Sequence, residues 1–323
     1  MSVKIFAAFL LCISSAFSLF EECVIPPLVC PNENITFWLY TRANKNNPHE
    51  LTVSNPESII SAPWVNNSPI KVLIHGYTGH KDFSPNTEIR PAYMECCDYN
   101  IISVDYNKIA LEPCYIEAAQ NTELVGMCLA QLIDELVQNY RFQLSQFHII
   151  GFSLGGQTAG NVANFLKSGK LDRISGLDPA LPLFATLNKT RKLDSSDAHF
   201  VDVLHTNALL KGKFEASGHA DFYSNGGVMQ PGCRSTENQT KSGCDHARAP
   251  RYYAESITTT TGFYAIKCSS WISYMIGWCD LMSSEEVIYG EYTPKNSTGL
   301  YFFSTNSEPP YALGPRKLIT GYL

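Results

Sequence analysis

The chain has 323 residues, of which 45% are hydrophobic and 17% are charged, and its formal net charge is −6. This length suffices for a sizeable core, and the composition is that of a globular protein, which excludes a disordered chain. Because Lys and Arg form no block, we expect no nucleic-acid partner and no electrostatic capture by an anionic membrane.

The N-terminal segment has the features of a signal peptide. One cation, Lys4, precedes an apolar stretch at 5–13, and the small residues Ala16 and Ser18 suit the positions before a cleavage site. A membrane anchor is the alternative, but the stretch is shorter than the ~20 residues that a span needs. We therefore predict that residues 1–18 are removed and that the protein is secreted into the extracellular space.

The cysteine content agrees with export. Ten cysteines remain once Cys12 leaves with the signal peptide, and an even number in an exported chain indicates disulfides. A zinc site is not expected, because no Cys-x-x-Cys pair occurs. Cys233–Cys244 and Cys268–Cys279 are close in sequence and predict two local bridges. The pairing of the other six stays open: Cys23, Cys30, Cys96, Cys97, Cys114 and Cys128. Sequons at Asn34, Asn66, Asn188, Asn238 and Asn296 are acceptable glycan sites in that compartment.

Short runs of β-branched or aromatic residues alternate with helical patterns along the chain. Strands are predicted at 35–40, 71–74, 101–106, 147–152, 174–177 and 200–206. Apolar residues at near-3.6 spacing predict a helix over 117–140, and a second helix follows Ser153 to about Leu166. This alternation predicts a mostly parallel sheet with helices on both faces. Residues 19–323 are expected to form one α/β domain.

The strand at 147–152 leads into Gly151-Phe152-Ser153-Leu154-Gly155. In the pattern Gly-x-Ser-x-Gly, the serine occupies a sharp turn between a strand and a helix, and the crowding there requires small neighbours. The turn raises the hydroxyl above the carboxyl edge of the sheet and places the next amide at a helix N-terminus. Ser153 is the candidate nucleophile, and a purely structural serine in a turn is the alternative.

A serine hydroxyl needs a base to become nucleophilic. If the acid and the base follow the serine in the chain, the base is His199, His205, His219 or His246. His199 and His205 lie in a predicted strand, and His219 begins another, so all three suit structural roles. His246 lies on a predicted loop before a helical pattern, where catalytic groups are common. We therefore choose His246.

The predicted site also needs an acid that orients the base and backbone donors that stabilise an oxyanion. Asp178 follows the strand at 174–177 and would orient the base from the carboxyl edge of the sheet, whereas Asp202 lies inside a strand and is the weaker candidate. The amides of Tyr77 and Leu154 could face one point and stabilise an oxyanion. His75 precedes the serine and is expected to brace the Tyr77 loop.

Six segments in order, listed here, cover most of the mature chain and together resemble the pancreatic lipase family: KVLIHGYTG, GFSLGGQTAG, GLDPALP, SSDAHFVDVLHTN, GHADFYSNGGVMQPGC and CDHARAPRYYAES. The resemblance implies an α/β-hydrolase fold and a lipase or phospholipase A1 activity. It makes Ser153 the nucleophile, Asp178 the acid and His246 the base, with Tyr77 and Leu154 as oxyanion donors. Many α/β hydrolases carry the acid after a later strand, where this chain has the uncharged Asn207.

The sequence departs from the family pattern in three respects. Phe152 stands where the family usually has histidine before the nucleophile. The C-terminal β-sandwich that binds colipase is not found, so no colipase partner is expected, and we predict a monomer. The lid bounded by Cys233 and Cys244 holds ten residues without a large apolar side chain, which resembles the phospholipase A1 branch and insect secreted lipases.

The resemblance also raises the question of a metal. Asp194 and Asp197 fall where the pancreatic enzyme binds a structural calcium ion. Calcium takes six to eight oxygen ligands, and two carboxylates are too few, so a solvated acidic turn is the favoured interpretation and no cofactor is required.

The leading functional hypothesis is a secreted ester hydrolase for acyl-glycerol lipids, cleaving the sn-1 ester of phospholipids, triacylglycerols, or both. The expected substrate is a phospholipid, triacylglycerol or galactolipid at an interface. An inactive, yolk-protein-like lipid carrier and an esterase for small soluble esters are the alternatives, because a triad of residues is necessary but not sufficient for lipid hydrolysis.

Overall fold

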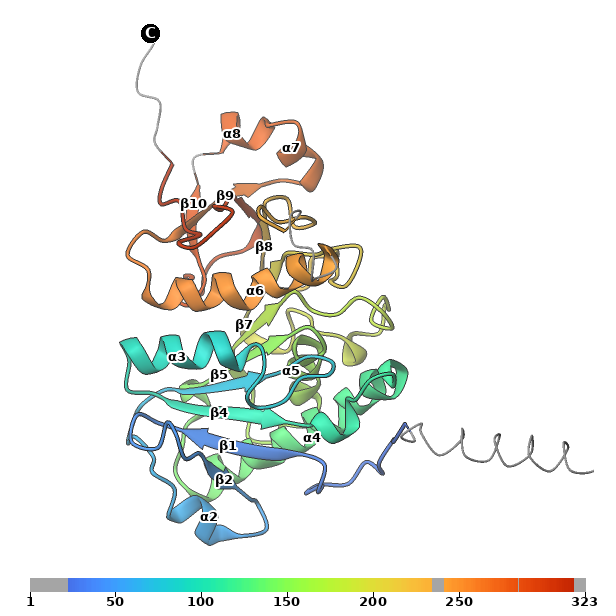
Figure 1. The fold of residues 1–323 in the computed structure, drawn as a ribbon, viewed down its shortest axis with the longest axis vertical. Coiled ribbons are helices and arrows are strands. Elements are labelled where there is room, and N and C mark those ends of the chain that lie inside the picture. The colour runs from blue at the N-terminus through green and yellow to red at the C-terminus, as the bar shows by residue number, and fades with distance from the viewer. Residues whose placement is uncertain (1–22, 234–240, 284, 317–323) are drawn as a thin grey trace, which may run out of the picture.

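The computed structural model describes the chain except for residues 1–22, 234–240, 284 and 317–323. Within the described residues, eleven strands form a single sheet in the order β10-β9-β11-β8-β7-β6-β5-β3-β4-β1-β2 (Figure 1). The strands are β1 Thr36–Tyr40, β2 His49–Leu51, β3 Ile70–Ile74, β4 Asn100–Asp105, β5 Phe147–Phe152, β6 Leu171–Leu177, β7 Ala198–His205, β8 Ala220–Ser224, β9 Phe263–Cys268, β10 Glu286–Tyr289 and β11 Gly299–Phe303.

Neighbouring strands from β4 to β11 across the middle of the sheet are parallel, and antiparallel pairs close both edges. The register brings the ends of the central strands level, since Ile74 of β3 pairs with Gly151 of β5, and Gly151 pairs with Gly176 of β6. The residues that follow β3, β5, β6 and β7 therefore lie together at the carboxyl edge, where open α/β sheets bind ligands.

Helices cover both faces of the sheet. They are α2 Pro56–Ile60, α3 Asn86–Cys96, α4 Tyr115–Asn139, α5 Leu154–Phe165, α6 Lys241–Thr258, α7 Trp271–Met275 and α8 Trp278–Met282, with short 3-10 helices at Asn107–Ile109, Leu144–Gln146 and Lys189–Arg191. Side chains on a strand alternate between faces. Ile149 packs in the cluster with α4 and α5, and Ile150 packs in the cluster with α3 and α6. The predicted α/β architecture with helices on both faces is confirmed.

All six predicted strands occur, as do both predicted helices, with ends shifted by up to three residues. The largest shift is at the start of β6, which begins at Leu171 and not at residue 174. The polar residues Asp172 and Arg173 interrupt the apolar pattern, so the sequence did not indicate the first three residues of this strand. Arg173 is buried, and its guanidinium donates to both carboxylate oxygens of Asp202 at 2.8 and 3.0 Å. Asp202 is therefore the paired, structural carboxylate that its place in a strand predicted.

Five disulfides join all ten described cysteines. The predicted bridges Cys233–Cys244 and Cys268–Cys279 are confirmed. The pairs that the sequence left open are Cys23–Cys114, Cys30–Cys128 and the adjacent residues Cys96–Cys97. Among the described helices, none is long and apolar enough to cross a membrane.

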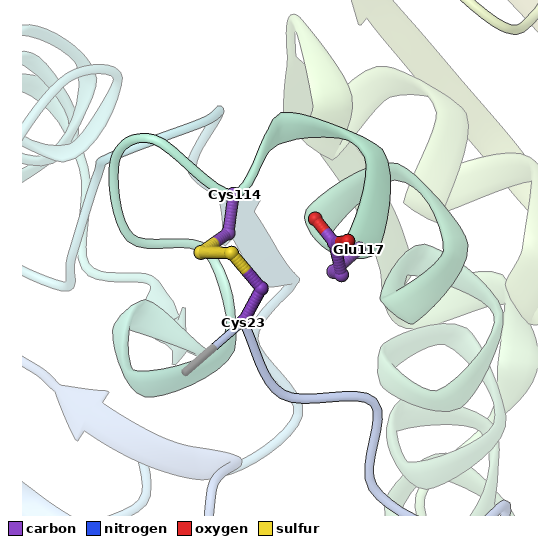
Figure 2. A group of neighbouring side chains, drawn as sticks. All are labelled: Cys23, Cys114 and Glu117. Atoms are coloured by element: carbon purple, nitrogen blue, oxygen red, sulfur yellow. A yellow bond between two sulfur atoms is a disulfide. The ribbon is translucent and has the colours of Figure 1, made fainter. Parts of the chain in front are cut away.

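One disulfide lies beside a carboxylate. Glu117 on the first turn of α4 approaches Cys23 and Cys114 within the reach of a shared metal ion (Figure 2). The thiolate is the form of cysteine that binds metals, and both sulfur atoms are used in the disulfide. Glu117 is left as a single carboxylate, which does not make a metal site.

Candidate active site

Ser153 stands between β5 and α5 with a backbone conformation of φ 57° and ψ −119°. This conformation is rare for a residue with a side chain and stores strain in the turn. A Cβ atom on Gly151 would lie 2.1 Å from the carbonyl oxygen of Gly155, and one on Gly155 would lie 2.2 Å from that of Ile74. Glycine is therefore required on both sides of Ser153 because backbone atoms occupy the space.

We expect Gly155→Ala to lower the free energy of unfolding by at least about 3 kcal/mol, because the added methyl group meets backbone that cannot rotate away. Urea denaturation measures this change. Gly277→Ala is the control, since no atom lies within 4 Å of its added Cβ and only its positive φ of 71° opposes alanine. That control should cost only about 1 kcal/mol. Equal losses in the two variants would contradict the steric account.

Asp178 directly follows β6 and is completely buried. Its Oδ1 atom accepts hydrogen bonds from the backbone amides of Thr206 and Asn207 at 2.9 and 3.1 Å. Its Oδ2 atom lies 2.5 Å from Nδ1 of His246. The chain after β7 thus contributes backbone donors that fix the carboxylate. This contribution was not apparent from the sequence, because any residue except proline can supply an amide.

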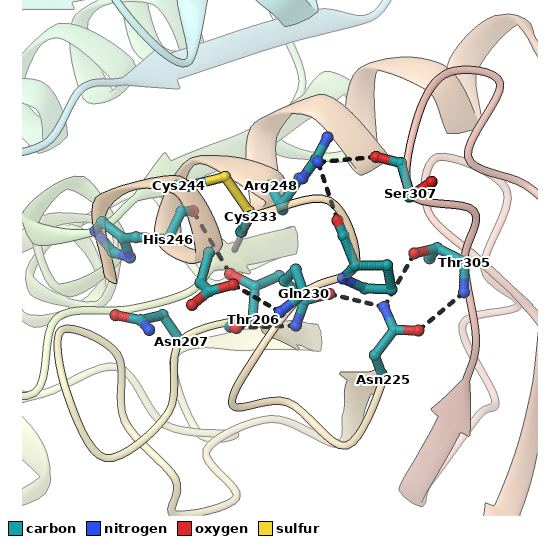
Figure 3. Close-up of a disulfide and its surroundings, with 12 residues drawn as sticks. Thr206, Asn207, Asn225, Gln230, Cys233, Cys244, His246, Arg248, Thr305 and Ser307 are labelled. Atoms are coloured by element: carbon teal, nitrogen blue, oxygen red, sulfur yellow. Dashed lines mark hydrogen bonds between the residues drawn. A yellow bond between two sulfur atoms is a disulfide. The ribbon is translucent and has the colours of Figure 1, made fainter. Parts of the chain in front are cut away.

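His246 lies inside α6, in its second turn, and not on the loop that the sequence suggested. Pro250 lies in the interior of this helix. Proline usually interrupts a helix, so the sequence did not indicate that the helix begins before it. Figure 3 shows His246 beside the Cys233–Cys244 disulfide, which ties the helix to the segment before it. Gln230 reinforces this link, because its amide donates to Asp245 at 2.6 Å and its side chain donates to the carbonyl of Thr206 at 2.9 Å.

Phe152, the departure from the family pattern, packs against the candidate base. Its ring centroid lies 4.6 Å from that of His246, with the planes tilted by 37°. The ring supports one side of the imidazole while Asp178 holds Nδ1, which leaves Nε2 as the nitrogen available to a substrate. This contact gives Phe152 a positioning role that its sequence position alone did not reveal.

The two candidate oxyanion donors belong to the segments that follow β5 and β3. Leu154 is the first residue of α5, and Tyr77 lies in the turn after β3. Within the described part of the chain, neither backbone amide has a protein acceptor. A Cβ atom on Gly76 would lie 3.4 Å from Oγ of Ser153, so the loop before Tyr77 passes directly against the serine.

His75 braces this loop, as the sequence predicted. Its Nδ1 atom donates to the carbonyl of Gly76 at 2.8 Å, and its Nε2 atom accepts from the amide of Tyr106 at 3.2 Å. The ring stacks on Tyr106 with centroids 4.0 Å apart. Burial lowers the pKa of His75 to about 4, so the imidazole is neutral at physiological pH.

This buried imidazole should make the fold sensitive to acid. A pKa lowered from 6.5 to about 4 means that the unfolded chain binds more protons than the folded chain between these values, so stability falls as the pH falls through this window. The loss from this group should reach roughly 2 to 3 kcal/mol at pH 4.5. Urea unfolding of wild type and His75→Asn at pH 7 and pH 4.5 measures it, and the wild type should lose more stability. Identical losses would contradict the assignment.

Ser153 and His246 line the same pocket of about 280 Å³. Half of its lining residues are aromatic or apolar, and Tyr77 packs edge-on against Tyr115 with ring centroids 5.1 Å apart. The remaining wall residues are Gly76, Thr78, Gly79, Phe83, Ser84, Phe152, Ala180, Pro182, Leu210 and Lys211. Lys211 and the aromatic side chains of Phe83 and Tyr115 lie outside the quoted motifs, and the sequence did not indicate that they share this pocket.

Asp194 and Asp197 do not form the solvated turn that was favoured from the sequence. Both are buried, with 7% and 6% of their surface exposed. Asp194 Oδ1 accepts from the amide and hydroxyl of Ser196, while Asp194 Oδ2 is buried and has no hydrogen-bond partner among the described residues. Burial raises the pKa of Asp197 to about 7. An unpartnered carboxylate oxygen beside a second carboxylate fits a hard cation such as calcium, which would need further oxygen ligands from the backbone.

Comparison with known proteins agrees with these features. A family model described as Lipase matches residues 20–311. Inactive pancreatic lipase-related protein 1 of Homo sapiens is 35% identical, over 74% of this chain and 54% of that protein. Pancreatic triacylglycerol lipase of Myocastor coypus is 33% identical, over 76% of this chain and 57% of that protein. The chain thus spans little more than half the length of these relatives.

Among solved structures, an α/β hydrolase from a deep-sea metagenome library matches 59% of this chain and 70% of its own, with 16% identity and a TM-score of 0.34. This likeness is too distant to add to the assignment. The family match extends over most of the chain, and the topology is that of an α/β hydrolase. The chain belongs to the pancreatic lipase family, as its sequence motifs predicted.

Proposed function

We propose that this protein is a serine carboxylic-ester hydrolase that acts on acyl-glycerol lipids. The observation that carries the proposal is the contact of 2.5 Å between His246 Nδ1 and Asp178 Oδ2, in a chain where His246 and Ser153 line one pocket. A positioned acid, a base and a strained serine are the parts that ester hydrolysis needs. The aromatic and apolar side chains in the pocket lining suit an acyl chain.

In the proposed reaction, Oγ of Ser153 attacks the ester carbonyl carbon and its proton passes to Nε2 of His246. Asp178 holds the imidazole and stabilises its positive charge. The amides of Tyr77 and Leu154 donate to the oxygen that becomes negative. His246 then protonates the departing alcohol, and water, activated by the same imidazole, releases the fatty acid from Ser153.

We further propose a preference for the sn-1 ester of phospholipids. Lys211 supports it, because this exposed cation lines the pocket that contains Ser153. Its backbone is fixed, since its carbonyl accepts from the amide of Leu181 at 2.8 Å and its amide donates to Asn207 at 3.2 Å. An ammonium group at this entrance would attract the phosphate of a head group.

The test of the function compares rates on phosphatidylcholine, triolein and a soluble nitrophenyl ester, below and above the dispersion limit of each lipid. We expect phosphatidylcholine to be cleaved at sn-1 and the rate to rise little at the interface. A strong preference for triolein, with a steep rise in rate at its interface, would contradict the phospholipid preference. It would still be consistent with a serine ester hydrolase. No hydrolysis of any ester would contradict the function itself.

Lys211→Gln should lower kcat/KM on phosphatidylcholine about fivefold, the size expected for an exposed charge pair. The rate on the soluble nitrophenyl ester should stay unchanged, because that substrate carries no phosphate. Lys45→Gln, which removes an exposed cation outside the pocket, is the matched control. A similar fall on both substrates, or on neither, would contradict the proposed role of Lys211.

A lipid carrier without activity is the second candidate, and one relative is named as an inactive lipase-related protein. This alternative predicts lipid binding without turnover, so the same comparison of substrates separates the two. We also propose that the protein is secreted. The five disulfides support secretion, since disulfides persist in oxidising compartments. The predicted signal peptide lies outside the described residues.

A further inference from the structure

Two short helices, between β9 and β10 in the chain, expose a cluster of large apolar side chains. Residues 268–281, here termed the apolar hairpin, contain α7, the start of α8 and the Cys268–Cys279 disulfide that closes them. Ile272, Ile276 and Leu281 are 69%, 71% and 81% exposed, and Met275 and Trp278 are more than half exposed. Figure 1 places α7 and α8 at one end of the molecule, beyond β9 and β10. From Cys268 to Cys279 the sequence has no charged residue.

The hairpin is held firmly to the sheet by its other face. Nε1 of Trp271 donates to the carbonyl of Gly226 at 2.9 Å. The ring of Tyr274 stacks on Phe302 of β11 with centroids 4.3 Å apart. Ser270 caps α7 by accepting from the amide of Ser273 at 3.1 Å. The inward aromatic side chains therefore fix the hairpin, and the outward apolar side chains are presented on a rigid support.

An apolar groove of about 550 Å³ lies between the hairpin and a neighbouring loop. Trp271 and Met275 form one wall, and the segment 225–232, with the half-exposed Met229, forms the other. This segment leads directly into Cys233, whose disulfide partner Cys244 stands two residues before His246. The wall of the groove is thus linked through the Cys233–Cys244 disulfide to the helix that carries the candidate base.

We propose that the apolar hairpin inserts into the surface of a zwitterionic lipid aggregate and holds the protein there while the active site takes up single lipid molecules. This inference rests on the proposed function, because an enzyme for lipids must engage an insoluble substrate. The ten residues between Cys233 and Cys244 include no large apolar side chain, so another surface has to make that contact.

Chemistry favours a lipid surface over a protein partner. Exposed Ile, Leu and Met side chains gain free energy in the acyl region, and Trp278 suits the boundary with the head groups. A protein interface of standard size carries a polar rim with hydrogen bonds. The hairpin has no charged residue between its two cysteines and a single one, Asp280, after them, which is too few for such a rim. The net charge of −6 favours zwitterionic over anionic lipid.

The test measures binding to vesicles of ether-linked phosphatidylcholine, which the esterase cannot hydrolyse. Wild type should cosediment with the vesicles, and brominated lipid should quench Trp278. The double variant Ile272→Asp and Ile276→Asp places two charges on the inserting surface and should weaken binding at least about tenfold. Ile276→Ala alone should give a smaller loss. Ile60→Asp on α2, at the opposite end in Figure 1, replaces an equally exposed isoleucine and should change nothing.

Activity on the soluble nitrophenyl ester separates this inference from the proposed function and reports correct folding. The double variant should retain that activity while losing vesicle binding and phosphatidylcholine turnover. Vesicle binding through the hairpin without any ester hydrolysis would overturn the function but support the lipid anchor. Unchanged vesicle binding in the double variant would overturn the anchor. So would a wild-type dimer that the double variant converts to a monomer, because a second copy would then cover this surface.

Discussion

Replacing Ser153 with alanine is expected to lower kcat for ester hydrolysis by about 10⁶-fold, the loss found when a serine hydrolase loses its nucleophile. The reason is that no other group stands in the strained turn between β5 and α5. A residual rate of about 10³-fold over water should remain, because the amides of Tyr77 and Leu154, the proposed oxyanion donors, would still be in place. Rates on the soluble nitrophenyl ester measure the change without the complication of an interface.

Ser175→Ala is a suitable control for this experiment. Ser175 is a completely buried serine on the neighbouring strand, and its hydroxyl donates to Asp202 at 2.8 Å. Its loss should affect stability and leave kcat per folded molecule intact. Comparable rates of ester hydrolysis in Ser153→Ala and wild type would contradict the proposed mechanism.

Asp178→Asn is expected to lower kcat by about 10⁴-fold. The side-chain amide of asparagine no longer favours the tautomer of His246 in which Nε2 is the acceptor for the proton of Ser153. Asp202→Asn is a matched comparison, since both carboxylates are buried. Asp178 directly follows β6, and Asp202 lies in the adjacent strand β7. Asp202→Asn weakens a buried ion pair with Arg173 and should cost about 3 to 5 kcal/mol of stability. Its folded fraction should keep near-normal kcat. The opposite pattern would make Asp202 the orienting acid.

The central parallel strands could be predicted from the sequence because each has a short run dominated by apolar residues and bounded by turn residues. β5 has one polar side chain, His148, within its apolar run, and the apolar residues around Asp202 still indicate a strand in β7. The outer strands β9 and β10 mix aromatic with charged residues, and the short β11 begins at a glycine, so the sequence did not distinguish them from loops. Their arrangement depends on aromatic stacking between distant segments, such as Phe222 on Tyr301 at 5.1 Å.

The sequence predicted individual residues of the candidate site where a local sequence pattern, such as a turn motif or a strand end, indicates their position. The turn at Ser153 and the position of Asp178 at a strand end follow from local sequence, and their approach follows from the parallel register. The helical setting of His246 did not, because Pro250 obscured the helix. The burial of Asp194 also depends on tertiary contacts, since the chain packs there against α5, where a Cβ on Gly160 would meet Asp197 at 2.8 Å.

The most direct test of the account is to label the active serine with an organophosphorus reagent and to locate the adduct by peptide mapping. We predict one adduct per molecule, on Ser153 alone, and none after Ser153→Ala. Asp178→Asn should slow the labelling, because the same imidazole activates the serine toward the reagent. An adduct on another serine, or no adduct on folded wild-type protein, would contradict the assignment of Ser153, His246 and Asp178 as the site of ester hydrolysis.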